Sequence, residues 1–295
     1  MTGYLFALIS SFFFSFYVVP RKFTKQPPIT FSFFMSIGFL VGAIFLYLLK
    51  PIIGFNEAPS IQLWWCLVAG MAWGLGIVCF VKSIDCIGLS RSNQWKNLQG
   101  PIGVILTLII LVEHTSTNPL YAIIAGLCVF ASAILFTVPQ KEKTHNQKEM
   151  IEGILLAFIS ATAFGIVTVI NKHVTDTVGV YLQQVVWSLS IFVSLFLYMA
   201  VSGQAKSLTV LKKTDIIIGF SSGLIYLGAS FFMLQSYRFI PASIGFTIIQ
   251  LNTIWTTLIG IFVFHEINVR KHPVRISLGF IFSLIGIVAL AYAKR

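Results

Sequence analysis

The stretch GYLFALISSFFFSFYVVPRKF at Gly3–Phe23 returns as GILLAFISATAFGIVTVINKH at Gly153–His173. The two align without a gap at an offset of 150 residues, and eight positions are identical, among them a glycine, a serine and a lysine. These positions are Gly3/Gly153, Leu5/Leu155, Ala7/Ala157, Ile9/Ile159, Ser10/Ser160, Phe14/Phe164, Val19/Val169 and Lys22/Lys172. Both stretches are apolar and about as long as a helix that crosses a bilayer. The sequence therefore predicts a membrane helix that occurs twice.

A second alignment extends the repeat at an offset of 153 residues. It pairs Gly70/Gly223, Ser83/Ser236, Ile87/Ile240, Ser90/Ser243, Leu98/Leu251, Glu113/Glu266 and Gly126/Gly279. The two offsets differ by only three residues, which is the size of a small change in one loop. We therefore predict two repeats, at residues 1–139 and 153–295, joined by a polar cytoplasmic linker at 140–152.

The composition indicates that most of the chain lies in lipid. Of 295 residues, 57% are hydrophobic and 10% are charged, whereas a soluble domain carries about 25% charged residues. The mean hydropathy is +0.90. We predict an all-α integral membrane protein with ten transmembrane helices, because ten apolar runs approach the length of about 20 residues that a spanning helix needs. The expected spans are Gly3–Val19, Pro28–Leu49, Gln62–Ile84, Asn93–Val112, Pro119–Val138, Ile151–Asn171, Val180–Val201, Asp215–Tyr237, Pro241–Phe264 and Pro273–Ala291.

Each repeat would contain five spans, and five is an odd number. Two successive copies of such a unit enter the membrane from opposite sides, so the repeats are predicted to be inverted. Inverted repeats are common in secondary transporters, whose substrate site forms between the repeats near the middle of the membrane. Repetition that serves packing alone is the competing interpretation.

The net charge of +11 indicates orientation in the membrane rather than a nucleic-acid partner. Lys and Arg collect in alternate loops, thirteen on the side of the first loop against five on the side of the termini. Cytoplasmic loops carry the excess of basic residues. We therefore expect both termini on the extracytoplasmic side of the plasma membrane.

The sequence contains none of the enzyme motifs that we searched for. It lacks G-x-x-x-x-G-K-[ST], H-E-x-x-H and G-x-S-x-G, so we expect no catalytic residues, no ATP-driven chemistry, no bound metal and no cofactor. The four cysteines lie within or at the edges of apolar spans without forming a C-x-x-C pair, which is typical of small buried apolar residues.

Three stretches carry a resemblance to a known family. They are LQSYRFIPASIGFTIIQLNTIWTTLIGIFVFHE, AGMAWGLGIVCFVKSIDCIGLS and FYVVPRKFTKQPPITFSFFMSIG. The first resembles the ten-helix drug/metabolite transporter superfamily. The other two are similar to its glucose/ribose porter branch and to its rhamnose-transporter relatives. The resemblance implies a plasma-membrane transporter that takes up a monosaccharide by alternating access. The fourth span departs from the branch, since SRSNQWKNLQGP is bulkier and more charged than the small and hydroxyl residues expected there.

Polar residues gather in the fourth and ninth spans. Buried polar residues in membrane spans are costly and commonly face a partner or a wet cavity. Side-chain amides both donate and accept hydrogen bonds, which suits sugar hydroxyls. At the offset of 153 residues, an amide pair of the fourth span aligns with an amide pair of the ninth. We therefore predict a substrate site that includes Asn93, Asn97, Gln99, Gln250 and Asn252. Hydrogen bonding between helices is the alternative role for these amides.

Two further features bear on this site. Pro101 follows the fourth-span cluster, where a bend or a freed carbonyl is expected. Lys96 lies about one turn from the cytoplasmic end of its span, so it either lines the site or extends to the membrane interface. Trp73, Tyr226 and Trp255 are candidate surfaces on which a sugar ring could stack, the first two at aligned positions of the repeats.

Other functions remain open at this point. An exporter of amino acids or other metabolites fits the same fold, and Lys96 favours it because a cation could bind a carboxylate. A non-transporting membrane scaffold would use the polar residues only for packing. No acidic residue lies clearly within a span, so coupling to protons is neither supported nor excluded by the sequence, and the oligomeric state is left open.

Overall fold

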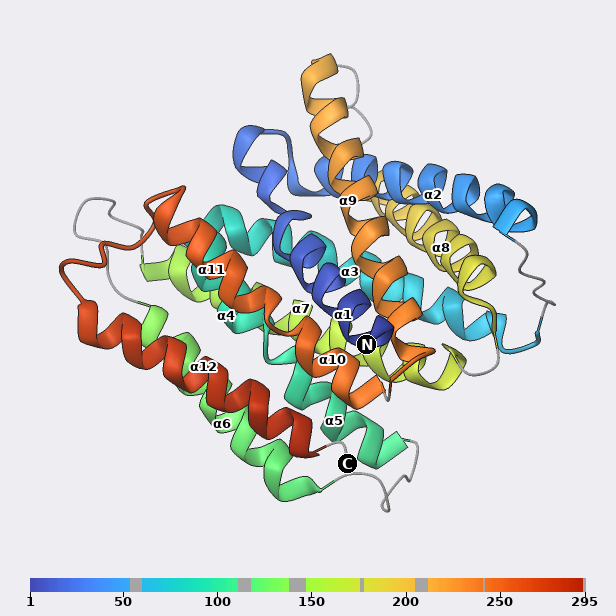
Figure 1. Cartoon of the computed structure of the whole chain (residues 1–295). Helices are drawn as coiled ribbons and strands as arrows, with labels where there is room; N and C mark the ends of the chain where they lie inside the picture. Colours follow the sequence, from blue (N-terminus) through green and yellow to red (C-terminus); the bar gives the residue numbers. More distant parts are fainter. Residues whose placement is uncertain are drawn as a thin grey trace. The chain divides into compact units, whose positions relative to one another are not determined.

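The computed structural model describes residues 1–53, 60–110, 118–137, 147–175, 178–204, 212–240 and 242–293. Throughout these ranges, every regular element is a helix (Figure 1). The helices are α1 Thr2–Phe16, η1 Val19–Phe23, α2 Pro28–Ile53, α3 Leu63–Ile87, α4 Leu89–Lys96, α5 Gln99–Ile110, α6 Pro119–Phe136, α7 Gln147–Thr175, α8 Val180–Val201, α9 Lys213–Tyr237, α10 Ala242–Ile249, α11 Asn252–Phe262 and α12 Pro273–Ala293.

Six stretches of the described chain are long and apolar enough to cross a membrane: Thr2–Phe23, Pro28–Lys50, Leu63–Ile87, Gln147–Asn171, Val180–Val201 and Lys213–Tyr237. This confirms an all-α, multi-pass membrane protein. The shorter apolar helices Ile123–Phe136, Asn252–Phe262 and Pro273–Ala289 fall within three of the other predicted spans.

The helix boundaries differ from the predicted spans in two places. The fourth and ninth spans, expected as single helices at Asn93–Val112 and Pro241–Phe264, each contain two helices. The helix of the sixth span begins at Gln147, so the residues from 147 to 152 that we assigned to the linker are helical. The remainder of that linker within the predicted range 140–152, residues 140–146, lies outside the described residues.

The chain forms two compact units, which are described separately. The first unit comprises residues 1–78 and 170–242, and the second comprises residues 79–169 and 243–295. Each unit takes segments from both sequence repeats. The division at 139 and 153 is a sequence prediction about repeats, and it does not coincide with the borders of the compact units.

Glycine brings two helix backbones together in the first unit. Figure 1 shows α9 crossing α2, and the two helices pack extensively. A Cβ atom at Gly38 would overlap the carbonyl oxygen of Phe220, and one at Gly223 would overlap that of Met35. Helices in lipid associate through such close van der Waals packing rather than through the hydrophobic effect. The spacing Gly219-x-x-x-Gly223 therefore accounts for this contact.

Buried serines join α1 to α9 in the same unit. The Ser10 hydroxyl donates to the Ala229 carbonyl oxygen at 2.7 Å, and the Ser222 hydroxyl donates to the Tyr17 carbonyl oxygen. Hydrogen bonds of this kind stabilise membrane helix pairs by about 0.6 kcal/mol each. They also explain why an apolar helix such as α1 has a serine-bearing face.

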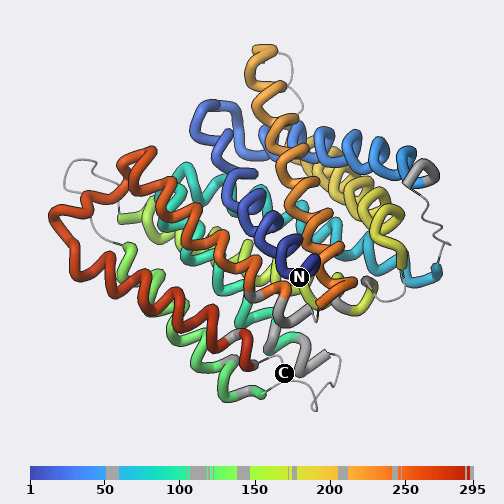
Figure 2. Tube along the Cα trace, in the orientation of Figure 1, coloured from blue at the N-terminus to red at the C-terminus, as the bar shows by residue number. Residues whose placement is uncertain are grey.

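In the second unit α6 and α12 lie side by side, as the tube trace shows (Figure 2). A Cβ atom at Gly279 would meet the Phe136 ring at 2.7 Å. The Ser132 hydroxyl donates to the Gly279 carbonyl oxygen at 2.8 Å. The glycine thus admits both the ring and the hydroxyl against the backbone of α12.

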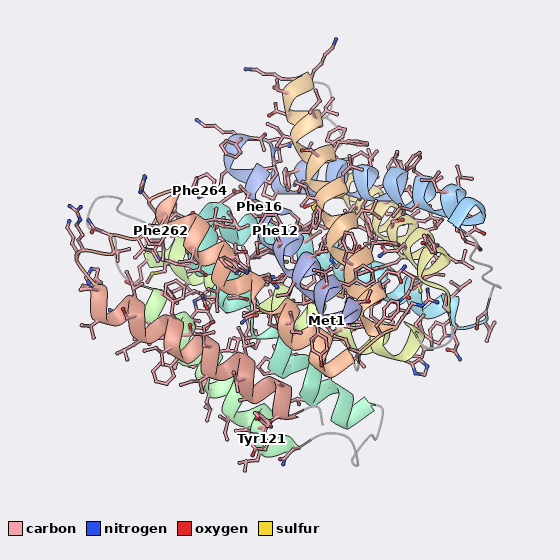
Figure 3. The ribbon with its side chains drawn as sticks, in the orientation of Figure 1. Met1, Phe12, Phe16, Tyr121, Phe262 and Phe264 are labelled. Atoms are coloured by element: carbon pink, nitrogen blue, oxygen red, sulfur yellow. The ribbon has the colours of Figure 1, made fainter. Side chains whose placement is uncertain are left out.

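The outward surface of the helices is apolar. Phe12, Phe262 and Tyr121, labelled in Figure 3, are exposed, together with many Leu, Ile and Val side chains of the described helices. Meanwhile 20 serine and threonine side chains of the described residues are buried. A soluble protein rarely exposes large contiguous apolar patches, so this distribution fits a protein that is surrounded by lipid.

Candidate functional site

The fourth span is interrupted at Asn97 and Leu98, between α4 and α5. The Leu98 amide donates to the Trp95 carbonyl and the Gly100 amide donates to the Asn97 carbonyl, both at 3.2 Å and both three residues back. In an α-helix the Asn97 carbonyl would accept a hydrogen bond from the amide of residue 101. That residue is Pro101, which has no N–H to donate. The helix is therefore interrupted just before Pro101, where a bend or a freed carbonyl is expected.

The ninth span is interrupted at Gln250 and Leu251, between α10 and α11. The Leu251 amide donates to the Ile248 carbonyl at 3.1 Å, and the Thr253 amide donates to the Gln250 carbonyl at 3.0 Å. Each bond occupies the position 153 residues after its counterpart in the fourth span. The two interruptions thus have the same hydrogen-bond pattern at aligned positions of the two repeats.

No proline causes the second interruption. Instead, the Asn252 side-chain amide donates to the Ile249 carbonyl oxygen at 2.7 Å. Asparagine side chains compete with the backbone for hydrogen bonds and so favour turns and helix starts over helix interiors. Two different residue types therefore interrupt the two repeats at the same place.

The N-terminus of α4 is capped from a distant part of the chain. Glu266 accepts hydrogen bonds from the Leu89 and Ser90 amides, each at 2.7 Å. Gly88 begins the helix at a φ of 85°, in the region that glycine adopts without strain. A carboxylate at this position also interacts favourably with the helix dipole. Glu266 thus has a clear structural role in fixing the start of α4.

Polar side chains join α4 to α11 along their length. The Ser90 hydroxyl donates to the Thr257 carbonyl oxygen at 3.4 Å, and the Asn93 side-chain amide donates to the Thr253 carbonyl oxygen at 3.3 Å. Residue numbers increase along one helix as they decrease along the other, so the helices are antiparallel. Asn97 follows α4 and Gln250 precedes α11, so both interruptions lie at the same end of this antiparallel pair.

Asn97 and Gln250 are buried with amide atoms that have no hydrogen-bond partner among the described residues. Asn97 is 2% exposed and Gln250 is 1% exposed. The unpartnered atoms are Oδ1 of Asn97 and both Oε1 and Nε2 of Gln250. A buried polar group without a partner costs about 1–3 kcal/mol. These atoms can therefore both donate to and accept from the hydroxyls of a bound solute.

The other predicted amides differ from this pair. Asn93 already binds the Thr253 carbonyl oxygen, and Asn252 binds the Ile249 carbonyl oxygen. Gln99 begins α5 and is only half-buried. Asn93 and Asn252 thus each stabilise a helix contact or a turn through the side-chain amide.

Lys96 ends α4, one residue before the interruption, and is 4% exposed. Its Nζ atom lies 5.1 Å from the centroid of the Phe80 ring and 6.0 Å from that of Phe164. No described carboxylate forms an ion pair with it. A lysine at the centre of a membrane helix costs about 2.5–3.5 kcal/mol on insertion scales. Lys96 is thus a buried cation held by aromatic rings.

The predicted aromatic pair belongs to the first unit. The Trp73 and Tyr226 ring centroids are 4.6 Å apart, and the Trp73 side chain hydrogen-bonds that of Tyr226. Tyr17, Phe39 and Trp187 surround Tyr226 with centroid distances of 5.0 to 6.2 Å. The two rings therefore pack on each other inside an aromatic cluster, and Trp73 is not a free stacking surface.

Two tryptophans complete the comparison with the sequence predictions. Trp255 is 50% exposed on α11, unlike the buried amides of the same unit. Trp187 of the seventh predicted span is a further candidate stacking surface, and its buried indole N–H has no acceptor in the described part of the chain.

The described residues contain no group of three or more His, Cys, Asp or Glu side chains that could hold a metal ion. The polar groups of the interruptions are amides, hydroxyls and one ammonium. They can bind a polar solute by hydrogen bonds and charge, without a covalent step.

Comparisons with known proteins give a consistent result. A family model described as sugar transport protein matches residues 1–138 and 59–293. A glucose uptake protein of Bacillus subtilis is 24% identical over 269 residues, covering 88% of this chain and 87% of that protein. A Listeria monocytogenes protein named for sugar uptake is 20% identical over 264 residues, covering 88% of each. One crystal structure matches with a TM-score of 0.65 at 12% identity, over 97% of this chain and 95% of that one, and this likeness concerns the fold alone.

Proposed function

This chain belongs to the sugar transport protein family, and from that membership we propose that it takes up a monosaccharide of the glucose or ribose type. The family match confirms the resemblance to the sugar-uptake branch drawn from the sequence. Relatives from Bacillus cereus and Bacillus subtilis named for glucose uptake align over 88% of the chain. Family and relatives indicate a transport protein rather than an enzyme.

The proposal includes ten spans in two inverted repeats that work by alternating access. The paired interruptions at Asn97 and Gln250 support it, because helices that break at aligned positions of inverted repeats form the substrate sites of many transporters. The contact between Trp73 and Tyr226 adds support. These residues are also aligned at the offset of 153. Two repeat-related residues can contact each other only near the two-fold axis that relates the repeats.

The observation that carries the proposal is the burial of unsatisfied amides at both interruptions. Asn97 and Gln250 lie at the same end of the antiparallel pair of α4 and α11, and they offer two acceptors and a donor group. Sugar hydroxyls both donate and accept, so a monosaccharide can satisfy these atoms. Gln99 and Asn252 begin the helices that follow the interruptions and would border the same site.

The proposed location is the plasma membrane, with both termini on the extracytoplasmic side. A phosphatase that is active only outside the cytoplasm, fused to the C-terminus, should be active. A green fluorescent protein fused at the same place should be dark. A fluorescent protein fusion together with an inactive phosphatase fusion would show that the C-terminus is cytoplasmic, which is the opposite orientation.

Uptake of labelled glucose into proteoliposomes tests the function. Saturable uptake is expected, and Asn97→Ala and Gln250→Ala should each reduce it at least about tenfold, since each loses hydrogen bonds to the solute. Asn268→Ala is the matched control, because Asn268 is an exposed amide outside the site. An inward proton gradient in a parallel series measures coupling. Normal uptake by both site variants would show that the site is elsewhere.

A second candidate is export of an amino acid or another metabolite on the same fold, which the buried Lys96 cation favours. Counterflow of amino acids without any sugar flux would support that function instead. A scaffold without transport activity predicts no accelerated flux of either solute class.

A further inference from the structure

The ammonium group of Lys96 has three N–H donors, and no described residue accepts a hydrogen bond from it. Its Nζ atom lies 5.1 Å from the ring centroid of Phe80 on α3 and 6.0 Å from that of Phe164 on α7. Rings stabilise a cation through their quadrupoles, but they do not replace the oxygen acceptors that an ammonium has in water. The group is therefore held in place with its hydrogen-bonding capacity unused.

The described carboxylates of the second unit either bind other groups of the protein or are exposed. Glu266 binds the N-terminus of α4, and Glu152 lies 2.6 Å from Lys82. Asp85 and Glu149 are exposed. Lys96 thus differs from Lys82, which is 50% exposed and paired with a carboxylate.

The position of Lys96 links this cation to the proposed sugar site. It is adjacent in sequence to Asn97, and Gln250 lies at the same end of the antiparallel pair of α4 and α11. The segment around the two interruptions therefore carries both a positive charge and neutral donors and acceptors. A neutral sugar would use only the second set.

We propose that the transported solute is a sugar acid, a monosaccharide derivative with one carboxylate and several hydroxyls. The carboxylate binds the Lys96 ammonium, and the hydroxyls bind Asn97 and Gln250. A single cation matches a monoanion, whereas a phosphate dianion would leave one negative charge without a counter-charge in a dry site. This inference rests on the proposed function, since it defines the substrate class of the same site.

The test uses labelled D-gluconate and D-glucose in proteoliposomes of the full chain, with D-gluconamide as the uncharged analogue of gluconate. Gluconate should inhibit uptake at concentrations about tenfold or more below those of gluconamide or glucose, because charge-assisted hydrogen bonds are the stronger class. Lys96→Met should reduce gluconate uptake about tenfold or more and should abolish the preference for gluconate over gluconamide. Lys82→Met is the matched control and should leave the preference for gluconate intact.

The outcomes separate this inference from the proposed function. Glucose uptake that gluconate does not inhibit would overturn the sugar-acid proposal and leave sugar transport standing. Equal inhibition by gluconate and gluconamide would do the same, and this comparison needs only the wild-type protein if Lys96→Met does not fold. Absence of flux for both solutes would overturn the proposed function itself. Stronger inhibition by glucose 6-phosphate than by gluconate would show that the anionic group of the solute is a phosphate rather than a carboxylate.

Discussion

Asn97 and Gln250 occupy aligned positions of two sequence repeats, and each lies at the interruption of a helix with buried amide atoms that no described group satisfies. The bonds of Ser90 and Asn93 to α11 make α4 and α11 antiparallel, so both interruptions lie at the same end of the pair. Buried polar groups are normally satisfied, and this is the reason for proposing a solute site at these two residues.

Asn97→Ala should therefore reduce transport activity without reducing stability. The free energy of unfolding should stay unchanged or rise by up to about 1 kcal/mol, because an unsatisfied carbonyl is removed, while sugar uptake falls. Asn93→Ala should instead lower stability by about 1 kcal/mol, since it removes the bond to the Thr253 carbonyl. Thermal unfolding in detergent measures both. A large stability loss in Asn97→Ala would mean that the amide has a structural partner.

Pro101→Ala should make the fourth span more continuous. The new N–H can donate to the Asn97 carbonyl, and alanine favours helix over proline. We expect stability to rise by about 1 kcal/mol and uptake to fall, because the interruption shapes the site. Pro273→Ala is the control, since Pro273 is the first residue of α12 and its missing N–H has no effect there. Unchanged uptake in Pro101→Ala would show that the bend is not needed for transport.

Glu266→Ala should destabilise the start of α4. Two hydrogen bonds to the Leu89 and Ser90 amides are lost, and loss of a helix cap costs about 0.5–2 kcal/mol. Glu152→Ala should cost less, because its ion pair with Lys82 is largely exposed and such pairs contribute about 0–1 kcal/mol. Chemical unfolding of the two variants in the same detergent gives the comparison, and equal losses would argue against the capping role.

Gly223→Val should prevent the close packing of α2 and α9. Its Cβ atom would overlap the Met35 carbonyl oxygen, and overpacking costs about 1–3 kcal/mol or more. Gly126→Ala should be tolerated, since its Cβ atom would meet Pro101 at an ordinary 3.5 Å. The fraction of monodisperse protein after detergent extraction reports the difference. Normal yields of Gly223→Val would mean that the helices can separate without loss of the fold.

Much of the fold could be predicted from hydropathy, because a lipid solvent demands long apolar helices with internally satisfied backbones. The six long stretches of the structure lie where the sequence predicts spans, with ends that differ by a few residues. The polar cluster before Pro101 also identified the region of the first interruption. Proline was the informative residue there, since it removes a backbone donor in any environment.

The second interruption could not be predicted in this way. The residues next to Gln250 include no proline, and the turn depends on the contact that Asn252 makes with the Ile249 carbonyl. Asparagine can make that contact, point to another helix or bind a solute, and the sequence does not choose among these. The mutual packing of Trp73 and Tyr226 depends on tertiary structure in the same way.

The glycine contact between α2 and α9 has a mechanical consequence. Side chains between two helices act as a compressible layer that allows small rotations about each helix axis. At Gly38 and Gly223 that layer is missing, and the backbone of each helix touches the other. If one helix rotated alone, a Cα atom of that helix would overlap a carbonyl oxygen of the other. We therefore expect α2 and α9 to move together as a rigid pair.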